Sequence, residues 1–187
     1  MKNTFVTLWP RNYCNFLKRS KDAGPIEVIY GGEHQSMPSI SSIRVGDTII
    51  PLAISDGSLY LVARMTVSRI EDPSAYMEAE YGLRKEPGIM WDSFLELIMT
   101  QPENLGHRIP RTCPTVAAVG IWGSEIRFDR KVPESILPVL KFGPKDKETK
   151  IIGIENGKLK SSVSFNGNVR RASVESTEML ERLFATV

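Results

Sequence analysis

The side chains best suited to bind an anion lie together on one loop, where residues 106–114 read Gly-His-Arg-Ile-Pro-Arg-Thr-Cys-Pro. Loops often carry binding groups, so Arg108 and Arg111 are candidate anion ligands with His107 beside them. Under the competing interpretation, both arginines pair with carboxylates of the acidic segment that precedes the loop. The residue types alone are compatible with both.

The same loop offers a thiol, Cys113, six residues after His107. Thiolate activation needs a base close in space, and this spacing, with no identifiable third member, does not support such a pair. The chain also has no phosphate-binding glycine loop, nucleophile elbow, zinc-protease motif or dinucleotide fingerprint. With 2 cysteines and 2 histidines it offers little for a metal. We therefore assign no catalytic residue, expect no metal or cofactor, and leave enzymatic activity undecided.

Two aromatic and two further basic residues complete the candidate ligand-binding set. Trp9 and Tyr30 each border a predicted turn, where a ring is available to stack on a base or another flat ligand. Arg127 and Arg130 follow Trp122 and are candidates for a phosphate-facing edge. The alternatives are a place in the core for the aromatic rings and paired charges at a strand end for the arginines.

Charge is unevenly distributed along the chain. Residues 71–103 carry eight acidic and two basic side chains, whereas residues 141–171 carry eight basic and three acidic ones. A basic face attracts polyanions, although a solvated surface without a partner is the competing interpretation. In the basic segment we predict an outward face that contacts a nucleic-acid backbone through Lys158, Lys160 and Arg170.

Turn and cap signals predict a β-rich mixture of strands and helices. Asp56-Gly57 between two apolar runs predicts a hairpin over residues 48–70, and Asp72-Pro73 predicts the start of a helix that Gly82 ends. Asn156-Gly157 and Asn166-Gly167-Asn168 predict the turns of an antiparallel meander over residues 150–172. We further expect strands at 5–9, 26–30, 116–119 and 125–128, and helices at 12–21, 92–100, 133–140 and from 173 onward.

Length and composition indicate one folded unit. A chain of 187 residues with 41% hydrophobic and 25% charged residues is long enough to bury a core and has an ordinary globular composition. We see no run of about 18 apolar residues and no secretory leader, so we expect a soluble, cytoplasmic protein without membrane contact. A glycine–proline break near residue 143 separates the main body, residues 1–143, from a C-terminal hairpin or meander and helix, residues 144–187, packed on the same unit.

The segment of residues 43–72 resembles the PUA-like superfamily, including its ASCH and EVE branches. In those small barrels a Val-Gly-Asp segment leads into a strand, as at Gly46-Asp47, and the next strand returns with a run that ends in valine, as at Val67. The run at residues 5–9, followed by Pro10 and a short helix, also looks like the first strand of such a barrel. At residues 51–53 the chain departs from the EVE pattern, which has an aromatic and histidine-bearing strand there.

This resemblance implies an α+β fold with a small mixed or antiparallel PUA-like β-barrel flanked by helices, most often used to bind RNA or modified bases in DNA. The first hypothesis is therefore a nucleic-acid-binding module for RNA, or for single-stranded or modified DNA. The second is an enzyme or binding protein for a small anionic or nucleotide-like ligand at the loop of residues 107–113. The third is a protein-interaction subunit that uses the acidic and basic faces.

Overall fold

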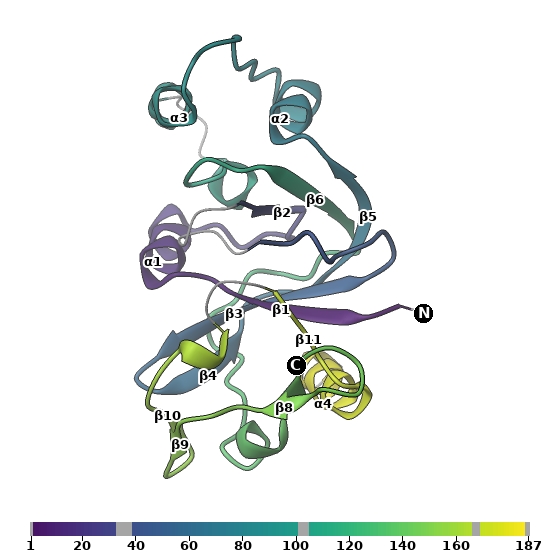
Figure 1. Cartoon of the computed structure of the whole chain (residues 1–187). Helices are drawn as coiled ribbons and strands as arrows, with labels where there is room; N and C mark the ends of the chain where they lie inside the picture. The colour runs from purple at the N-terminus through teal and green to yellow at the C-terminus, as the bar shows by residue number, and fades with distance from the viewer. Residues whose placement is uncertain (1, 33–38, 101–104, 166–168, 186–187) are drawn as a thin grey trace.

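A mixed seven-stranded sheet forms the centre of the structure, a computed structural model that describes residues 2–32, 39–100, 105–165 and 169–185 (Figure 1). The expected α+β class is confirmed, but the sheet is not closed into a barrel in the part of the chain that is described. β1 and β3 are parallel and the other pairs are antiparallel. The order is β11 (Arg170–Arg171), β1 (Thr4–Leu8), β3 (Thr48–Ser55), β5 (Met65–Glu71), β6 (Val116–Ile121) and β2 (Val28–Gly31), with β4 (Ser58–Leu61) paired to β3.

The predicted hairpin between β3 and β4 is confirmed. Asp56 and Gly57 have φ angles of 49° and 74°, and Ser55 pairs with Ser58 across the turn. Two positive φ angles in succession are what a tight hairpin turn requires, and Asp-Gly accepts them at low cost. The return arm is interrupted after Leu61, so β4 and β5 are separate strands rather than one.

The described residues form four α-helices around the sheet: α1 (Arg11–Ser20), α2 (Pro73–Tyr81), α3 (Trp91–Met99) and α4 (Val174–Ala185). The predicted start of α2 is confirmed, because the Asp72 carboxylate accepts hydrogen bonds from the backbone N–H groups of Ser74 and Ala75. Gly82 ends this helix with a φ of 66°. Within these described helices, none is long and apolar enough to cross a membrane.

Two further predictions are wrong. Residues 125–128 form no strand, because the N–H groups of Ile126 and Arg127 donate to the carbonyls of Ala23 and Val62 on two different segments. Residues 133–140 hold only a 3₁₀ turn, η2 (Leu137–Val139), because Pro138 lacks the N–H that an α-helix would use there.

The tail is not a meander. The Asn156-Gly157 turn is present, with φ angles of 50° and 73°, but it joins only β9 (Ile154–Glu155) to β10 (Lys158–Leu159). β8 (Thr149–Lys150) pairs back to β7 (Lys141–Phe142), the 3₁₀ turn η3 (Val163–Phe165) follows β10, and β11 joins the main sheet beside β1. The predicted turn at residues 166–168 lies outside the described residues.

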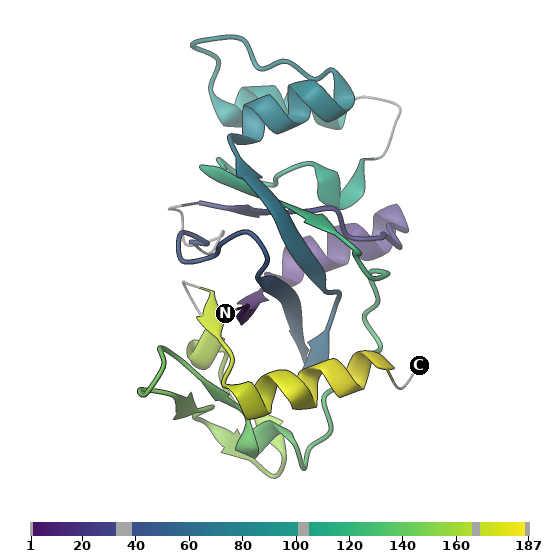
Figure 2. The same cartoon turned by 90° about the vertical axis from the view of Figure 1, so that its right-hand side faces the viewer.

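Both faces of the central strands are buried. Phe5 and Ile49 pack in a cluster with Leu17 of α1, whereas their neighbours Val6 and Ile50 pack in a second cluster beneath the tail. This alternation is what strands covered on both sides require. A third cluster lies between β2, β6 and the α2–α3 pair, which caps the end of the sheet opposite the tail (Figures 1 and 2). The sheet therefore contributes residues to all three clusters, and α1 packs against one of its faces.

Candidate functional site

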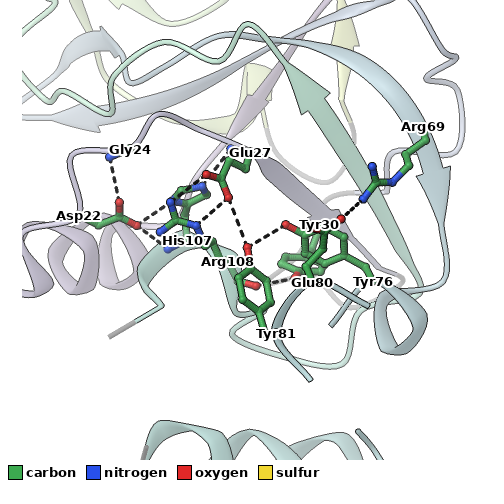
Figure 3. Close-up of polar contacts among 10 residues, drawn as sticks. All are labelled: Asp22, Gly24, Glu27, Tyr30, Arg69, Tyr76, Glu80, Tyr81, His107 and Arg108. Carbon is green, nitrogen blue, oxygen red and sulfur yellow. Dashed lines mark hydrogen bonds and ion pairs between the residues drawn. The ribbon is translucent and has the colours of Figure 1, made fainter. Parts of the chain in front are cut away.

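His107 lies at the centre of a buried polar network (Figure 3). It belongs to the 3₁₀ turn η1 (Gly106–Arg108), is 0% exposed, and places Nδ1 2.7 Å from Oδ2 of Asp22. The backbone N–H of Glu27 donates to its Nε2 at 3.0 Å, and its own N–H donates to Asp22 at 2.6 Å. Since Nε2 accepts a hydrogen bond, the ring proton sits on Nδ1 and faces the carboxylate. Both ring nitrogens are occupied, so this histidine anchors the loop.

Asp22 is the acidic partner that fixes this loop. Burial raises the pKa of Asp22, but hydrogen bonds and charge interactions, mainly with His107, outweigh it and bring the pKa to about 2. Gly106 approaches this carboxylate so closely that a Cβ atom would lie 2.0 Å from Oδ2, and its φ is 54°. Only glycine fits that position.

Arg108 is likewise engaged inside the protein. Its guanidinium donates to both carboxylate oxygens of Glu27, at 2.7 and 2.9 Å, in a two-pronged ion pair (Figure 3). The Tyr30 hydroxyl donates to the Arg108 carbonyl at 2.6 Å, and the Tyr81 hydroxyl donates to Glu27 at 3.3 Å. The expected partners from the acidic segment before the loop are not used, since Glu27 comes from 81 residues earlier in the chain.

Arg127 and Arg130 do not form a free phosphate-facing edge. Arg127 pairs with Asp129 at 2.7 Å, the ordinary paired charge that the alternative interpretation predicts. Arg130 donates to the carbonyls of Val62 and Glu125, and burial lowers its pKa. Arg130 therefore links Val62, which lies between β4 and β5, to the segment that contains Glu125.

The three predicted backbone ligands of the tail differ in availability. Lys160 pairs with Glu155 at 3.2 Å. Arg170 donates to the carbonyls of Ser164 and Phe142 and to the Thr149 hydroxyl. Among the described side chains no carboxylate pairs with Lys158, which is exposed. The three do not lie on one strand, because Lys158 belongs to β10, Lys160 follows that strand and Arg170 belongs to β11.

Three other predicted residues come together in one pocket. Trp9, Tyr30 and Arg111 line a cavity of about 100 Å³, with Tyr13 and Thr112 between them. A buried water needs roughly 10–15 Å³ of such space, so the cavity is large enough for a small ring or several waters. It lies where the end of β1, the first turn of α1, β2 and the loop after η1 meet. We call it the aromatic pocket.

Aromatic rings and one cation define the chemistry of this pocket. The Trp9 and Tyr13 rings are 5.0 Å apart at 73°, and the Arg111 guanidinium lies 4.4 Å from the ring centre of Phe16. Burial, together with the nearby Asp22 charge, raises the pKa of Tyr13 well above its usual value, so its hydroxyl keeps its proton. Arg111 is exposed and forms no ion pair with any described carboxylate. The pocket thus combines flat apolar walls with one available positive charge.

Thr112 adds an unpaired polar group. Its Oγ1 is buried and has no hydrogen-bond partner among the described residues. A buried hydroxyl without a partner costs about 1–3 kcal/mol, which a ligand that hydrogen-bonds to it would recover. Sequence reasoning missed Thr112 and also Tyr13, which appears in the sequence as part of an apolar helix face. The signal for Tyr13 was its place in the first helical turn, directly after Trp9 and Pro10.

No model of a known protein family matches the chain, and no curated protein matches it either. Within the described ranges, no three histidine, cysteine, aspartate or glutamate side chains converge as they would around a metal ion. The thiol of Cys14 is buried, and burial raises its pKa to about 11, so it is unsuited to act as a nucleophile.

Proposed function

We propose that the protein binds a nucleotide, either free or as a unit of single-stranded RNA or DNA, in the aromatic pocket. The observation that carries the proposal is the convergence of Trp9, Tyr13 and Tyr30 with Arg111 in one cavity. Unstacked bases rest on aromatic faces, and phosphates pair with arginine. Thr112 supports a heterocyclic ring over a plain hydrocarbon one, because its hydroxyl needs a hydrogen-bonding partner.

A PUA-like origin stays part of this proposal. The Val-Gly-Asp segment that carries the resemblance has a local structural role here, since the buried Asp47 carboxylate accepts the N–H groups of Asn3 and Arg44, both at 2.9 Å. This bonding ties the start of β3 to the start of β1. The parallel β1–β3 pair also places Trp9 at the pocket.

The test is calorimetric titration with the four common nucleoside monophosphates and with the corresponding nucleosides. We expect the monophosphates to bind, the nucleosides to bind more weakly, and Arg111→Gln to lower the affinity at least about tenfold, since a charge-assisted hydrogen bond contributes about 1.5–3 kcal/mol. The matched control is Arg84→Gln, which removes an exposed arginine near α2. Heat signals that are absent up to millimolar ligand, or equal affinities in both variants, would refute the proposal.

Homopolymeric single strands distinguish the two sources of a nucleotide. A free-nucleotide protein binds a monophosphate at least as tightly as a strand, because it contacts one unit only. A strand-binding protein gains affinity with length and loses it steeply with added salt.

A further inference from the structure

A second, more polar pocket lies on the other side of Trp9. Its volume is about 320 Å³, and Trp9 is a wall of both pockets. Arg11 and Lys18 of α1 line it, together with Ser55 and Tyr60 of the β3–β4 hairpin. Two cations with hydroxyl groups around them form a setting for an anion, whereas the aromatic pocket suits a ring.

A third hollow continues the same path. It is more open, measures about 470 Å³, and shares Lys18 and Phe128 with the second pocket. Lys18 places its ammonium group 4.7 Å from the centre of the Phe128 ring, between the two hollows. Lys21 adds a further cation at the end of α1. The hollow is also lined by two carboxylates that have partners inside the protein, Asp22 with His107 and Asp129 with Arg127. The three hollows therefore follow one another along α1, each sharing a wall with the next.

The cations that α1 contributes to this path lack ion-pair partners among the described residues. Helix α1 contains no acidic residue, and among the described side chains no carboxylate forms an ion pair with Arg11, Lys18 or Lys21. Unpaired charges of one sign on one helix produce a positive potential that attracts a polyanion. This differs from the tail, where Lys160 is already neutralised by Glu155.

Spacing argues for a ligand with more than one phosphate. Arg11 and Lys18 are seven residues apart on one helix, which puts them two turns and about 10 Å apart along the axis. A single phosphate whose base fills the aromatic pocket does not reach both. A strand does, because its backbone supplies a phosphate at every nucleotide.

We infer that these hollows form one track along α1 for a single strand of nucleic acid, with a base in the aromatic pocket and successive phosphates beside Arg11 and Lys18. The inference rests on the proposed function and extends it from one nucleotide to a strand. Aromatic and basic side chains line the track, as they do in sites that bind single strands with little sequence preference.

The test compares Arg11→Gln/Lys18→Gln with the matched control Arg84→Gln/Lys145→Gln, which removes an exposed arginine and an exposed lysine away from α1, using a uridine 8-mer, a thymidine 8-mer, uridine monophosphate and ATP as probes. For the track variant we expect at least a tenfold loss of 8-mer affinity at low salt. Its slope of log affinity against log salt becomes shallower by about 1.4, since each phosphate contact on a single strand contributes about 0.7. Its affinity for uridine monophosphate stays within twofold, and the control variant matches the wild type.

Each other outcome contradicts a definite part of this scheme. An 8-mer that binds no tighter than uridine monophosphate overturns the track and leaves the proposed function standing. If ATP binds as tightly as the 8-mers and loses affinity in the track variant, the cations bind a triphosphate. That result would overturn the proposal that a strand binds along α1. If only the control variant loses 8-mer affinity, the strand binds outside the track and the inference is wrong. If no probe binds the wild type, both proposals fail. Thermal melting shows whether both variants are folded, as expected for exposed side chains.

Discussion

At the scale of single residues, chemical type alone does not decide between an internal and a ligand-facing role. His107 and Arg111 are four residues apart on one loop, yet the first is fully buried with both nitrogens engaged and the second is exposed without an ion pair among the described residues. The difference comes from Asp22 and Glu27, which lie more than 75 residues earlier in the chain and provide the partners for His107 and Arg108. Sequence spacing within the loop holds no information about them.

Replacing Asp22 with asparagine is expected to produce a stability loss that depends on pH. The pKa of Asp22 is lowered on folding to about 2, so its ionised form stabilises the folded state above the unfolded value near 4. At pH 7 we expect Asp22→Asn to lower the free energy of unfolding by about 2 kcal/mol. As the pH falls from about 4 to 2, the wild type loses this contribution and the difference shrinks. Urea unfolding at pH 7, 4 and 2.5 measures it, and a constant difference would contradict the assignment.

Thr112 allows ligand contact to be separated from folding. Thr112→Val keeps the shape and removes the buried unpaired Oγ1, so we expect the free energy of unfolding to stay equal or to rise by up to about 1 kcal/mol. Nucleoside monophosphate affinity should fall about fivefold or more, because a ligand that hydrogen-bonds to this hydroxyl loses its partner. Titration and urea unfolding of the same samples check both. Unchanged affinity would remove Thr112 from the site.

At the scale of elements, features determined by neighbouring residues follow from the sequence, whereas features determined by distant partners do not. The Asp56-Gly57 and Asn156-Gly157 turns and the Asp72 cap each depend on a few adjacent residues and are found as predicted. The meander fails because β11 pairs with β1, a strand far away in the sequence, and not with its chain neighbours. In the candidate site, Trp9, Tyr30 and Arg111 were identified from their positions beside turns or on a loop, but their convergence depends on how β1, β2 and that loop meet.

Arg170 and Lys158 are expected to differ sharply when each is replaced by glutamine. Arg170 fixes three segments through the carbonyls of Ser164 and Phe142 and the Thr149 hydroxyl, so its loss leaves acceptors unpaired. We expect Arg170→Gln to cost about 2–3 kcal/mol and Lys158→Gln to cost less than about 0.5 kcal/mol. Thermal and urea unfolding provide the comparison, and equal effects would show that the Arg170 bonds contribute nothing to stability.

At the scale of the whole molecule, the tail is joined to the rest through the central strands. β8 pairs with β7 across the predicted boundary near residue 143, and Leu180 of α4 packs in the cluster that contains Val6 and Ile50. Segments on either side of that boundary therefore share one buried layer.

This shared layer predicts a single unfolding transition. Leu180→Ala should lower the free energy of unfolding by about 2–5 kcal/mol, as for other fully buried leucines. All 3 tryptophans lie before residue 143, so their fluorescence reports on the main body alone. We expect the whole tryptophan transition to shift to lower urea together with the far-ultraviolet circular dichroism. A tryptophan transition that stays in place would show that the tail unfolds by itself.

The position of β1 between β3 and β11 also has a consequence for biosynthesis. A ribosome makes β1 before the other described strands of the sheet, and it makes β11, which covers the outer edge of β1, after them. Until β11 has been made, β1 therefore has an unpaired edge, which is a template for aggregation. Any product that terminates before residue 170 keeps that edge open permanently. The sheet becomes complete only when this last described strand has been made.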